Sequence, residues 1–314
     1  MESFENRLVT VLMPCYNEPE IFFRTAIESV INQTYKNLEI LLILDNPQNN
    51  LLARIAREYQ ANDQRIRFVI NEQNLKLTST LNKGLKLATG DIIARFDADD
   101  VMMPERIQKQ MQFVDQYDLI STNFAFINNK GDIVRHRSFP SESDEIYYFL
   151  QNNADCMYHT TWLGKKETFL KLNGYREIGP FEDYDFLLRA IKKRLKFYNC
   201  LEELNYYRVN TDGISYKNKI LQHLGSEYIR EHSVTIDDIT KNEIMLYMES
   251  DRGKKHTKEY KKFCRITMKL YSSKNILDYY IHLLMLGPYL ALFNYYGRKK
   301  FIGFFTKIIN YKKI

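Results

Sequence analysis

Short apolar segments alternate with amphipathic segments through about the first hundred residues, and this alternation limits the possible fold most. The apolar segments are predicted strands at residues 8–13, 39–44, 66–70 and 91–96. Between them, apolar residues at helical spacing predict helices at residues 20–33, 51–59 and 77–88. This order predicts an α/β fold, a mostly parallel sheet with helices on both faces.

Polar side chains gather directly after three of these strands. They are Tyr16 and Glu18 after the first strand, Asp45 after the second, and Asp97, Asp99 and Asp100 after the fourth. Ligands of open parallel sheets bind beyond the carboxyl ends of the strands. We therefore expect these side chains to converge on one site.

The run Asp97-Ala-Asp99-Asp100 is the strongest local signal. Carboxylates this close repel one another unless a cation lies among them, and hard oxygen ligands suit Mg²⁺ or Mn²⁺ completed by substrate phosphates. Acids that cap the helix predicted after Pro104 are the alternative, and spacing alone leaves both open. Asp45 could bind a base or ribose, or stabilise the Asp-Asn-Pro turn. Tyr16 could stack on a base, or cover the sheet edge.

A second acidic group opens a helix predicted after Pro180, and it consists of Glu182, Asp183 and Asp185. A carboxylate there could act as a general base, but acids in a first turn also stabilise the helix dipole. His159 and Trp162 could line an acceptor cleft, although a lone histidine is more often structural.

Together these motifs resemble family 2 glycosyltransferases, which have the GT-A fold. The matching segments, in order, are residues 9–18 with 29–35, 39–45, 74–84, 90–100 and 181–189. The likeness covers roughly residues 7–215. It implies a GT-A catalytic domain at residues 1–215 and leaves residues 216–314 as a helical, basic C-terminal extension.

The resemblance implies inverting transfer of one sugar from a nucleotide-sugar donor, with UDP favoured over GDP and dTDP. Donor-binding residues would be Pro14, Tyr16, Glu18, Asp45 and Asp97. Asp99 would bind the Mn²⁺ or Mg²⁺ ion, and Asp183 would deprotonate the acceptor hydroxyl. Secondary candidates, for acceptor contacts or the metal shell, are Glu182, Asp185, His159, Trp162, Arg189 and Asn210. The acceptor would be a glycan or polyprenyl-linked glycan in surface polysaccharide biosynthesis, such as a capsule or O-antigen.

Two positions depart from the family pattern. Leu44 replaces the first of two acids after the second strand, and Asn210 stands where the family often has a histidine that reaches the metal or diphosphate. These changes keep a second hypothesis open, a catalytically impaired sugar-nucleotide-binding partner in a membrane glycan-assembly complex.

The charge distribution sets the C-terminal region apart. Residues 252–314 hold 15 lysines and arginines against two acids, whereas the rest holds 30 against 37. With the apolar and aromatic blocks of residues 281–305, this predicts a tail on an anionic membrane surface; a helical lid over the core is the alternative. We see no nucleic-acid-binding motif, secretory signal or apolar run of roughly 18 residues, and the four cysteines are dispersed. We therefore expect a cytoplasmic protein, peripheral on the inner face of the cell membrane.

Overall fold

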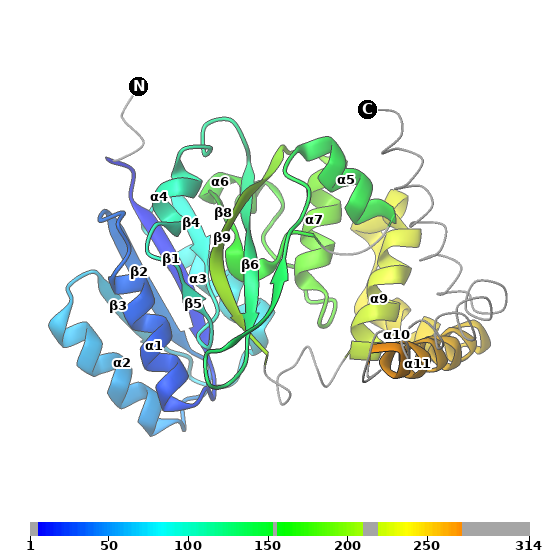
Figure 1. Ribbon diagram of the computed structural model, residues 1–314, viewed down its shortest axis with the longest axis horizontal. Helices are drawn as coiled ribbons and strands as arrows, with labels where there is room; N and C mark the ends of the chain where they lie inside the picture. The colour runs from blue at the N-terminus through cyan, green and yellow to red at the C-terminus, as the bar shows by residue number, and fades with distance from the viewer. Residues whose placement is uncertain (1–5, 153–155, 210–218, 272–314) are drawn as a thin grey trace. The chain divides into compact units, whose positions relative to one another are not determined.

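The computed structural model describes residues 6–152, 156–209 and 219–271 (Figure 1). The first half alternates strand and helix as predicted: β1 (Val9–Cys15), α1 (Glu20–Ile31), β2 (Leu38–Leu44), α2 (Asn50–Asn62), β3 (Ile66–Ile70), α3 (Lys76–Leu87) and β4 (Ile92–Arg95). The next elements are β5 (Val101–Met102), α4 (Arg106–Met111), β6 (Leu119–Ile127), β7 (Ile133–Arg137), α5 (Ser143–Asn152) and η2 (His159–Thr161). They are followed by β8 (Leu163–Lys165), α6 (Lys166–Lys171), α7 (Glu182–Lys192) and β9 (Phe197–Arg208).

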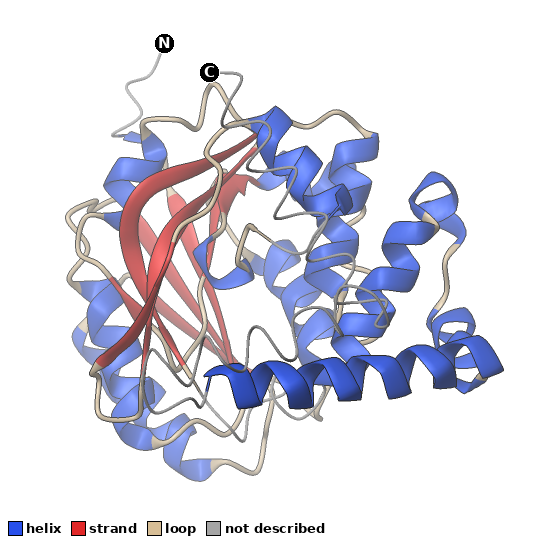
Figure 2. Ribbon diagram, turned by 45° about the vertical axis from the view of Figure 1, so that its right-hand side comes forward, coloured by secondary structure: helices blue, strands red, loops and turns tan. Residues whose placement is uncertain are grey.

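One twisted sheet contains these strands in the order β3-β2-β1-β4-β8-β6-β9-β5, with β7 paired to β6 (Figure 2). The four strands of the first half are parallel neighbours, which confirms the predicted α/β arrangement. β8 is antiparallel to both β4 and β6, and β5 is antiparallel to β9. This half of the sheet is mixed, because it combines these antiparallel pairs with the parallel pair β6–β9.

The register of the central strands brings their carboxyl ends to one edge. Cys15 of β1 lies opposite Leu44 of β2, and Leu12 of β1 lies opposite Arg95 of β4. The loops after β1, β2 and β4 therefore begin at the same edge of the sheet, where the sequence predicts a site.

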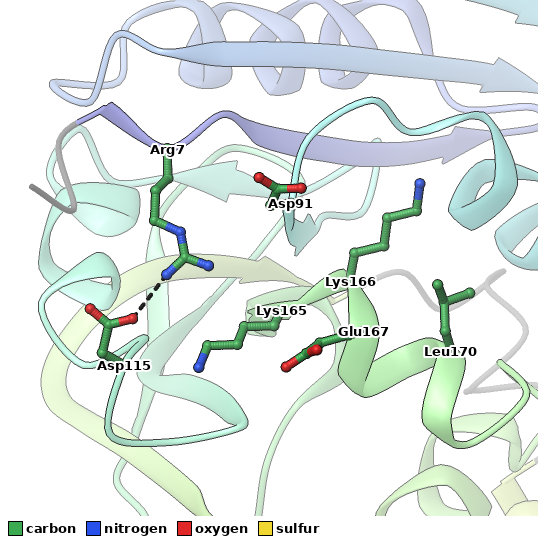
Figure 3. A pocket seen from close by; sticks show the side chains of 7 residues that line it. All are labelled: Arg7, Asp91, Asp115, Lys165, Lys166, Glu167 and Leu170. Atoms are coloured by element: carbon green, nitrogen blue, oxygen red, sulfur yellow. Dashed lines mark hydrogen bonds and ion pairs between the residues drawn. The ribbon is translucent and has the colours of Figure 1, made fainter. Parts of the chain in front are cut away.

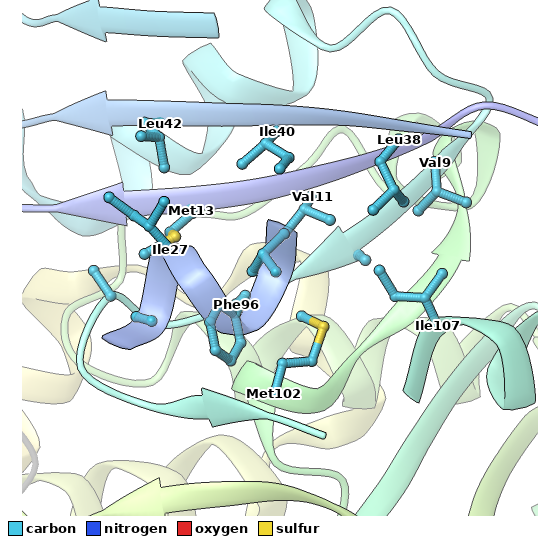
Figure 4. Close-up of a cluster of buried hydrophobic side chains, with 14 of the residues drawn as sticks. Val9, Val11, Met13, Ile27, Leu38, Ile40, Leu42, Phe96, Met102 and Ile107 are labelled. Atoms are coloured by element: carbon cyan, nitrogen blue, oxygen red, sulfur yellow. The ribbon is translucent and has the colours of Figure 1, made fainter. Parts of the chain in front are cut away.

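Both faces of the central strands are buried, which explains their continuous apolar sequence. One face carries alternate residues of β1 and β2, including Val11 and Ile40, and packs against Ile27 of α1 and Phe96 (Figure 4). On the other face, α3 approaches β1 closely at Gly84. A Cβ at this position would lie 2.2 Å from Cδ1 of Leu12, so a larger residue would force the Leu12 side chain to move.

The chain divides into two compact units. The first comprises Met1–Lys217 with Ser233–Asp237, and the second comprises Asn218–His232 with Asp238–Ile314. As a functional division, the predicted boundary at residue 215 stays a prediction.

The second unit is helical in its described part. It contains α9 (Lys219–Glu231), α10 (Lys241–Glu249) and α11 (Asp251–Tyr271). All of η3 (Ser233–Asp238) except Asp238 belongs to the first unit. Leu224, Tyr260 and Phe263 form its apolar cluster. None of the helices in the described residues is long and apolar enough to span a membrane.

Candidate active site

The loop after β1 brings a carboxylate to the acids that follow β4. Oε2 of Glu18 accepts a hydrogen bond from the backbone N–H of Tyr16 at 2.8 Å. Burial raises the pKa of Glu18 to about 7, and the charges of Asp99 and Asp97 add to the rise. Burial also raises the pKa of Asp99 to about 6, with the charge of Asp97 as the next cause. Glu18, Asp97 and Asp99 thus share one electrostatic cluster.

A buried arginine lies within this cluster. Arg95 ends β4 and is 2% exposed, and its Nη1 lies 2.5 Å from Oδ1 of Asp97. Burial alone would lower the pKa of Arg95, but the charge of Asp97 and their ion pair outweigh it, so the pKa is raised. Its Nε is buried and has no hydrogen-bond partner among the described residues. The surrounding acids offset the cost of burying this charge.

Asp100, the third acid of the run, uses its carboxylate to hold neighbouring segments together. Its Oδ1 accepts a hydrogen bond from the backbone N–H of Arg208, and its Oδ2 accepts one from the Thr160 hydroxyl, both at 2.8 Å. The Nε of Arg208 also donates to the carbonyl oxygen of Asp99 at 2.8 Å. Asp100 therefore ties the loop to β9 and η2, while the less buried Asp97 and Asp99 remain for a ligand.

The start of α7 brings two further acids into the same electrostatic environment. Burial raises the pKa of Glu182 to about 8, with the charge of Asp183 as the next cause. Burial likewise raises the pKa of Asp183. Arg95 lowers the pKa of both acids, whereas Asp97 raises it. The fold thus brings the predicted base into the environment of the predicted donor-site acids.

Asp185, two residues further along the helix, lies in a buried ion-pair network. It is fully buried and pairs with Arg176 and with Arg189, whose Nε lies 2.8 Å from Oδ2. Arg189 also donates to the carbonyl oxygens of Leu172 and Gly174. This network holds the segment that follows α6 against α7. Asp185 and Arg189 therefore have a structural role in this network, and their acceptor contact stays a prediction.

Asp45 lies at the same edge of the sheet as Glu18. Its Oδ1 accepts hydrogen bonds from the Asn71 amide at 2.7 Å and from the backbone N–H of Leu75 at 2.8 Å. Burial raises the pKa of the Cys15 thiol, and the charges of Glu18 and then Asp45 add to it. Asp45 therefore anchors the loop after β3, and its contact with a base or ribose stays a prediction.

The remaining candidates differ in exposure. Pro14 is buried within β1 opposite Ile43, while Tyr16 is 47% exposed just beyond the strand. The predicted donor contacts of both stay predictions. Asn210 and the predicted membrane-binding segment at residues 281–305 lie outside the described residues.

His159 and Trp162 pack inside the protein. They are 8% and 0% exposed, and their ring centroids are 4.6 Å apart. Nε2 of His159 lies 2.8 Å from the Tyr175 hydroxyl, and the indole N–H of Trp162 donates to the carbonyl oxygen of Met157 at 2.8 Å. Both side chains thus pack within the protein, and their role in lining an acceptor cleft stays a prediction.

A family model described as "Glycosyl transferase family 2" matches residues 10–172, more than half of the chain. The chain belongs to glycosyltransferase family 2. It is 34% identical over 213 residues to an uncharacterized glycosyltransferase of Methanocaldococcus jannaschii, covering 66% of this chain and 72% of that one. It is 29% identical over 209 residues to the O-antigen biosynthesis glycosyltransferase WbnJ of Escherichia coli, covering 65% and 80%.

A solved structure shows the same fold. This glycosyltransferase aligns with S. aureus TarS 1-349 in complex with UDP-GlcNAc at a TM-score of 0.59, with 14% identity, over 91% of this chain and 81% of that one. The predicted GT-A architecture and enzyme class are confirmed.

The acids of this glycosyltransferase fit a metal ion shared with a substrate. Among the described residues, no three His, Cys, Asp or Glu side chains are arranged to hold a metal by themselves. Mg²⁺ typically takes one or two carboxylates and completes its shell with water and substrate phosphates. Asp97 and Asp99 can supply such a pair, and the unpartnered Nε of buried Arg95 can supply a donor for an anion.

Sequence reasoning missed Arg95 and Arg208 in this site. A signal for Arg95 was present, because one charged residue within the apolar run Ile92-Ile-Ala-Arg-Phe96 needs a compensating partner if the strand is buried. Arg208 gave no comparable signal, since its contacts with Asp99 and Asp100 join residues more than a hundred positions apart.

An open cleft of about 550 Å³ lies at the opposite, amino-terminal edge of the parallel strands (Figure 3). Arg7 and Asp115 pair across it at 2.9 Å, and Asp91, Lys165, Lys166, Glu167 and Leu170 complete its lining. Its basic and acidic side chains are mixed, and none of the predicted site residues lines it.

Proposed function

We propose that this glycosyltransferase moves one sugar from a nucleotide-sugar, with UDP as the favoured carrier, to an acceptor hydroxyl with inversion at the anomeric carbon. The observation that carries the proposal is the gathering of Glu18, Asp97 and Asp99 with the start of α7 around Arg95. The chemistry needs both halves of this cluster: a site for the donor diphosphate and a base for the acceptor.

The donor half would hold a charged diphosphate. A Mn²⁺ or Mg²⁺ ion held by Asp99, with Asp97 beside it, would neutralise the negative charge that develops on the leaving nucleoside diphosphate. Arg95 keeps Asp97 in place through their 2.5 Å ion pair. Glu18 and Asp45 border the same strand ends, where base and ribose would lie.

The acceptor half would remove a proton. Asp183 would take the proton from the acceptor hydroxyl as its oxygen bonds to the anomeric carbon, and the bond to the diphosphate oxygen would break with its electron pair. The raised pKa of Asp183 makes it a better base than an exposed aspartate. The raised pKa of Glu182 keeps much of that side chain protonated near neutral pH, which limits repulsion beside the base.

The acceptor that we propose is a glycan or polyprenyl-linked glycan of a surface polysaccharide. A relative named for O-antigen biosynthesis supports this class. We further propose that the C-terminal unit brings the enzyme to the inner face of the cell membrane. Exposed basic residues on α11 support this, namely Arg252, Lys254, Lys255, Lys258, Lys261 and Lys262. Binding of the intact chain and of a chain ending at Asp251 to phosphatidylglycerol vesicles tests it: equal binding of both would contradict the proposal.

Hydrolysis of the donor in the absence of acceptor tests the catalytic proposal. Purified protein is incubated with UDP-, GDP- and dTDP-sugars and Mn²⁺ or Mg²⁺, and released nucleoside diphosphate is measured. We expect slow release from one donor, lost with EDTA and in Asp99→Asn. Asp91→Asn is the matched control, because this exposed acid lies at the opposite edge of the sheet. Release that persists in EDTA and in Asp99→Asn would contradict the metal assignment.

A further inference from the structure

Tyr175 contacts three parts of the candidate site at once. It lies between α6 and α7 and is 3% exposed. Its backbone is bonded to α3, its hydroxyl to η2, and its ring packs against α7. Each of these contacts leads to a different group of the predicted site residues.

The Asn82 side chain on α3 binds the backbone of Tyr175 twice. Its Nδ2 donates to the carbonyl oxygen of Tyr175 at 2.8 Å, and its Oδ1 accepts the Tyr175 N–H at 2.9 Å. Gly174 makes this approach possible, because its φ of +68° favours glycine and a Cβ there would collide with Oδ1 of Asn82. One side-chain amide thus satisfies both backbone groups of Tyr175, which lies outside any helix or strand.

The helix that carries Asn82 also supports Asp45 on the donor side. Thr80, two residues before Asn82, accepts a hydrogen bond from the Asn71 amide at 2.9 Å. The same amide donates to Asp45 at 2.7 Å. Helix α3 is therefore linked by hydrogen bonds both to the predicted nucleotide contact and to Tyr175.

The Tyr175 hydroxyl reaches the segment that fixes the loop after β4. It lies 2.8 Å from Nε2 of His159. The next residue, Thr160, accepts the backbone N–H of Asp97 at 3.1 Å and donates to Asp100 at 2.8 Å. Tyr175 is thus bonded one residue away from the contacts that hold the acids of this loop.

The Tyr175 ring packs on the face of α7 that carries the predicted base. Its centroid lies 5.3 Å from that of Phe186. Asp183 and Phe186 are three residues apart on α7, so they share one face of the helix. The next residue, Arg176, adds an ion pair with Asp185. These contacts hold the first turn of α7 against Tyr175.

We propose that Asn82 and Tyr175 are positioning residues, which hold Asp183 at a fixed place relative to the loop after β4. This inference rests on the proposed function, in which Asp183 is the base and that loop binds the donor. Neither positioning residue needs to touch a substrate. A single displacement requires the base, the attacking oxygen and the anomeric carbon to be aligned, and a misplacement of about 1 Å can cost about a hundredfold in rate.

Two variants interrupt the connection at different points. Asn82→Ala removes both bonds to the Tyr175 backbone, whereas Tyr175→Phe removes the bond to His159 and keeps the ring. The intact chain is incubated with Mn²⁺ and UDP-glucose, UDP-galactose or UDP-N-acetylglucosamine, and hydrolysis is measured. We expect each variant to hydrolyse the donor about tenfold or more slowly, while its affinity for UDP, measured by calorimetry, changes less than about twofold.

Thr10→Val is the control for a general loss of stability. Thr10 is fully buried near the start of β1, where its hydroxyl donates to Glu39 and accepts the backbone N–H of Gly90. This variant should unfold at a lower temperature, as Asn82→Ala should, but it should hydrolyse the donor like the wild type. Asn62→Ala, at an exposed position on α2, should change neither property.

Two further measurements separate positioning from simple destabilisation. In Asn82→Ala, hydrogen exchange followed by mass spectrometry should become faster in residues 172–177 and in the first turn of α7, because the Tyr175 N–H loses its acceptor. The double variant Asn82→Ala/Tyr175→Phe should slow hydrolysis by less than the product of the two single factors, because both changes act on the position of one residue.

The outcomes separate this inference from the proposed function. Unchanged exchange at the first turn of α7 in Asn82→Ala would overturn the inference. So would an Asn82→Ala rate no lower than that of Thr10→Val, an equal loss of UDP affinity and rate, or effects that multiply fully in the double variant. If the wild type hydrolyses none of the three donors, the exchange and the UDP affinity decide. A wild-type chain that binds no UDP, or an Asp183→Asn variant that hydrolyses the donor normally, would contradict the proposed function instead.

Discussion

Nη1 of Arg95 lies 2.5 Å from Oδ1 of Asp97, so a buried guanidinium holds the first acid of the loop that follows β4. The side chain of Asp97 remains 32% exposed, whereas that of Arg95 is 3% exposed. The positive charge of Arg95 is therefore buried within the sheet, while the carboxylate of Asp97 stays accessible to solvent. The same charge lowers the pKa of Asp99, Glu182 and Asp183, which burial raises.

Replacement of Arg95 should shift the pH dependence of catalysis. In Arg95→Met the pKa of Asp99 and of Asp183 should rise, because a nearby positive charge is lost. Because the base and the metal ligand act deprotonated, the acid limb of the pH profile of kcat/KM should move to higher pH. Arg95→Lys keeps the positive charge, so it should shift the acid limb less than Arg95→Met does. Identical profiles for the Arg95→Met variant and the wild-type enzyme would contradict this role of Arg95.

Asp183→Asn should slow transfer strongly without unfolding the enzyme. Loss of a general base typically costs about 10²–10⁴ in rate, so kcat should fall by that order while the affinity for UDP is retained. The variant should be at least as stable as the wild type, because removing the charge of Asp183 relieves repulsion with Glu182. Calorimetry with UDP and thermal unfolding are the companion measurements. An Asp183→Asn enzyme with near-normal kcat would show that another group is the base.

Asp185→Asn should have the opposite effect on stability. Asp185 is fully buried between Arg176 and Arg189, and removing one partner of a buried ion pair costs about 3–5 kcal/mol. Denaturant unfolding should show this loss in the free energy of unfolding. Asp183→Asn, two residues away on the same helix, is the matched control. Equal stability of the two variants would rule out the ion-pair network as a main support of α7.

His159 should make folding stability fall in acid. Burial holds the pKa of His159 well below its ordinary value, with the charge of Arg95 as the next cause, so the folded protein keeps it neutral. Below about pH 6.5 the unfolded chain binds a proton that the folded protein does not, so stability falls as the pH falls, by up to about 1.4 kcal/mol per pH unit.

The test compares the free energy of unfolding between pH 7 and pH 5. Other titrating groups contribute to the wild-type curve, so the difference between His159→Gln and wild type isolates this effect. The variant should lose less stability on acidification. Parallel curves for His159→Gln and the wild type would contradict the assignment.

The strands of the first half can be predicted because their burial requires apolar residues at nearly every position. β1 and β2 are buried on both faces and therefore appear as uninterrupted apolar runs between turn residues. β5 and β8 are two and three residues long and pair with distant segments, so no local periodicity marks them. For that reason the pairing of β5 and β8 could not be predicted from the sequence.

The sequence is enough to predict which loops form the site. It is not enough to predict which side chains of these loops face a ligand. Strand order alone places Glu18, Asp45 and Asp97 at one edge. Whether Asp99 or Asp100 faces a ligand depends on Thr160 and Arg208, which are distant in sequence. Asp183 and Asp185 occupy similar positions in one acidic turn, and only the contacts of Arg176 and Arg189 separate them.

Calorimetric titration of the intact chain with UDP, with Mn²⁺ and with EDTA, tests the central claim most directly, because it needs neither the right sugar nor the right acceptor. We predict saturable binding with Mn²⁺ that weakens about tenfold or more both in EDTA and in Asp99→Asn, while Asp91→Asn binds like the wild type. Absence of UDP binding under every condition, or equal binding by the wild type and Asp99→Asn, would contradict a metal-assisted donor site at the carboxyl edge of this sheet.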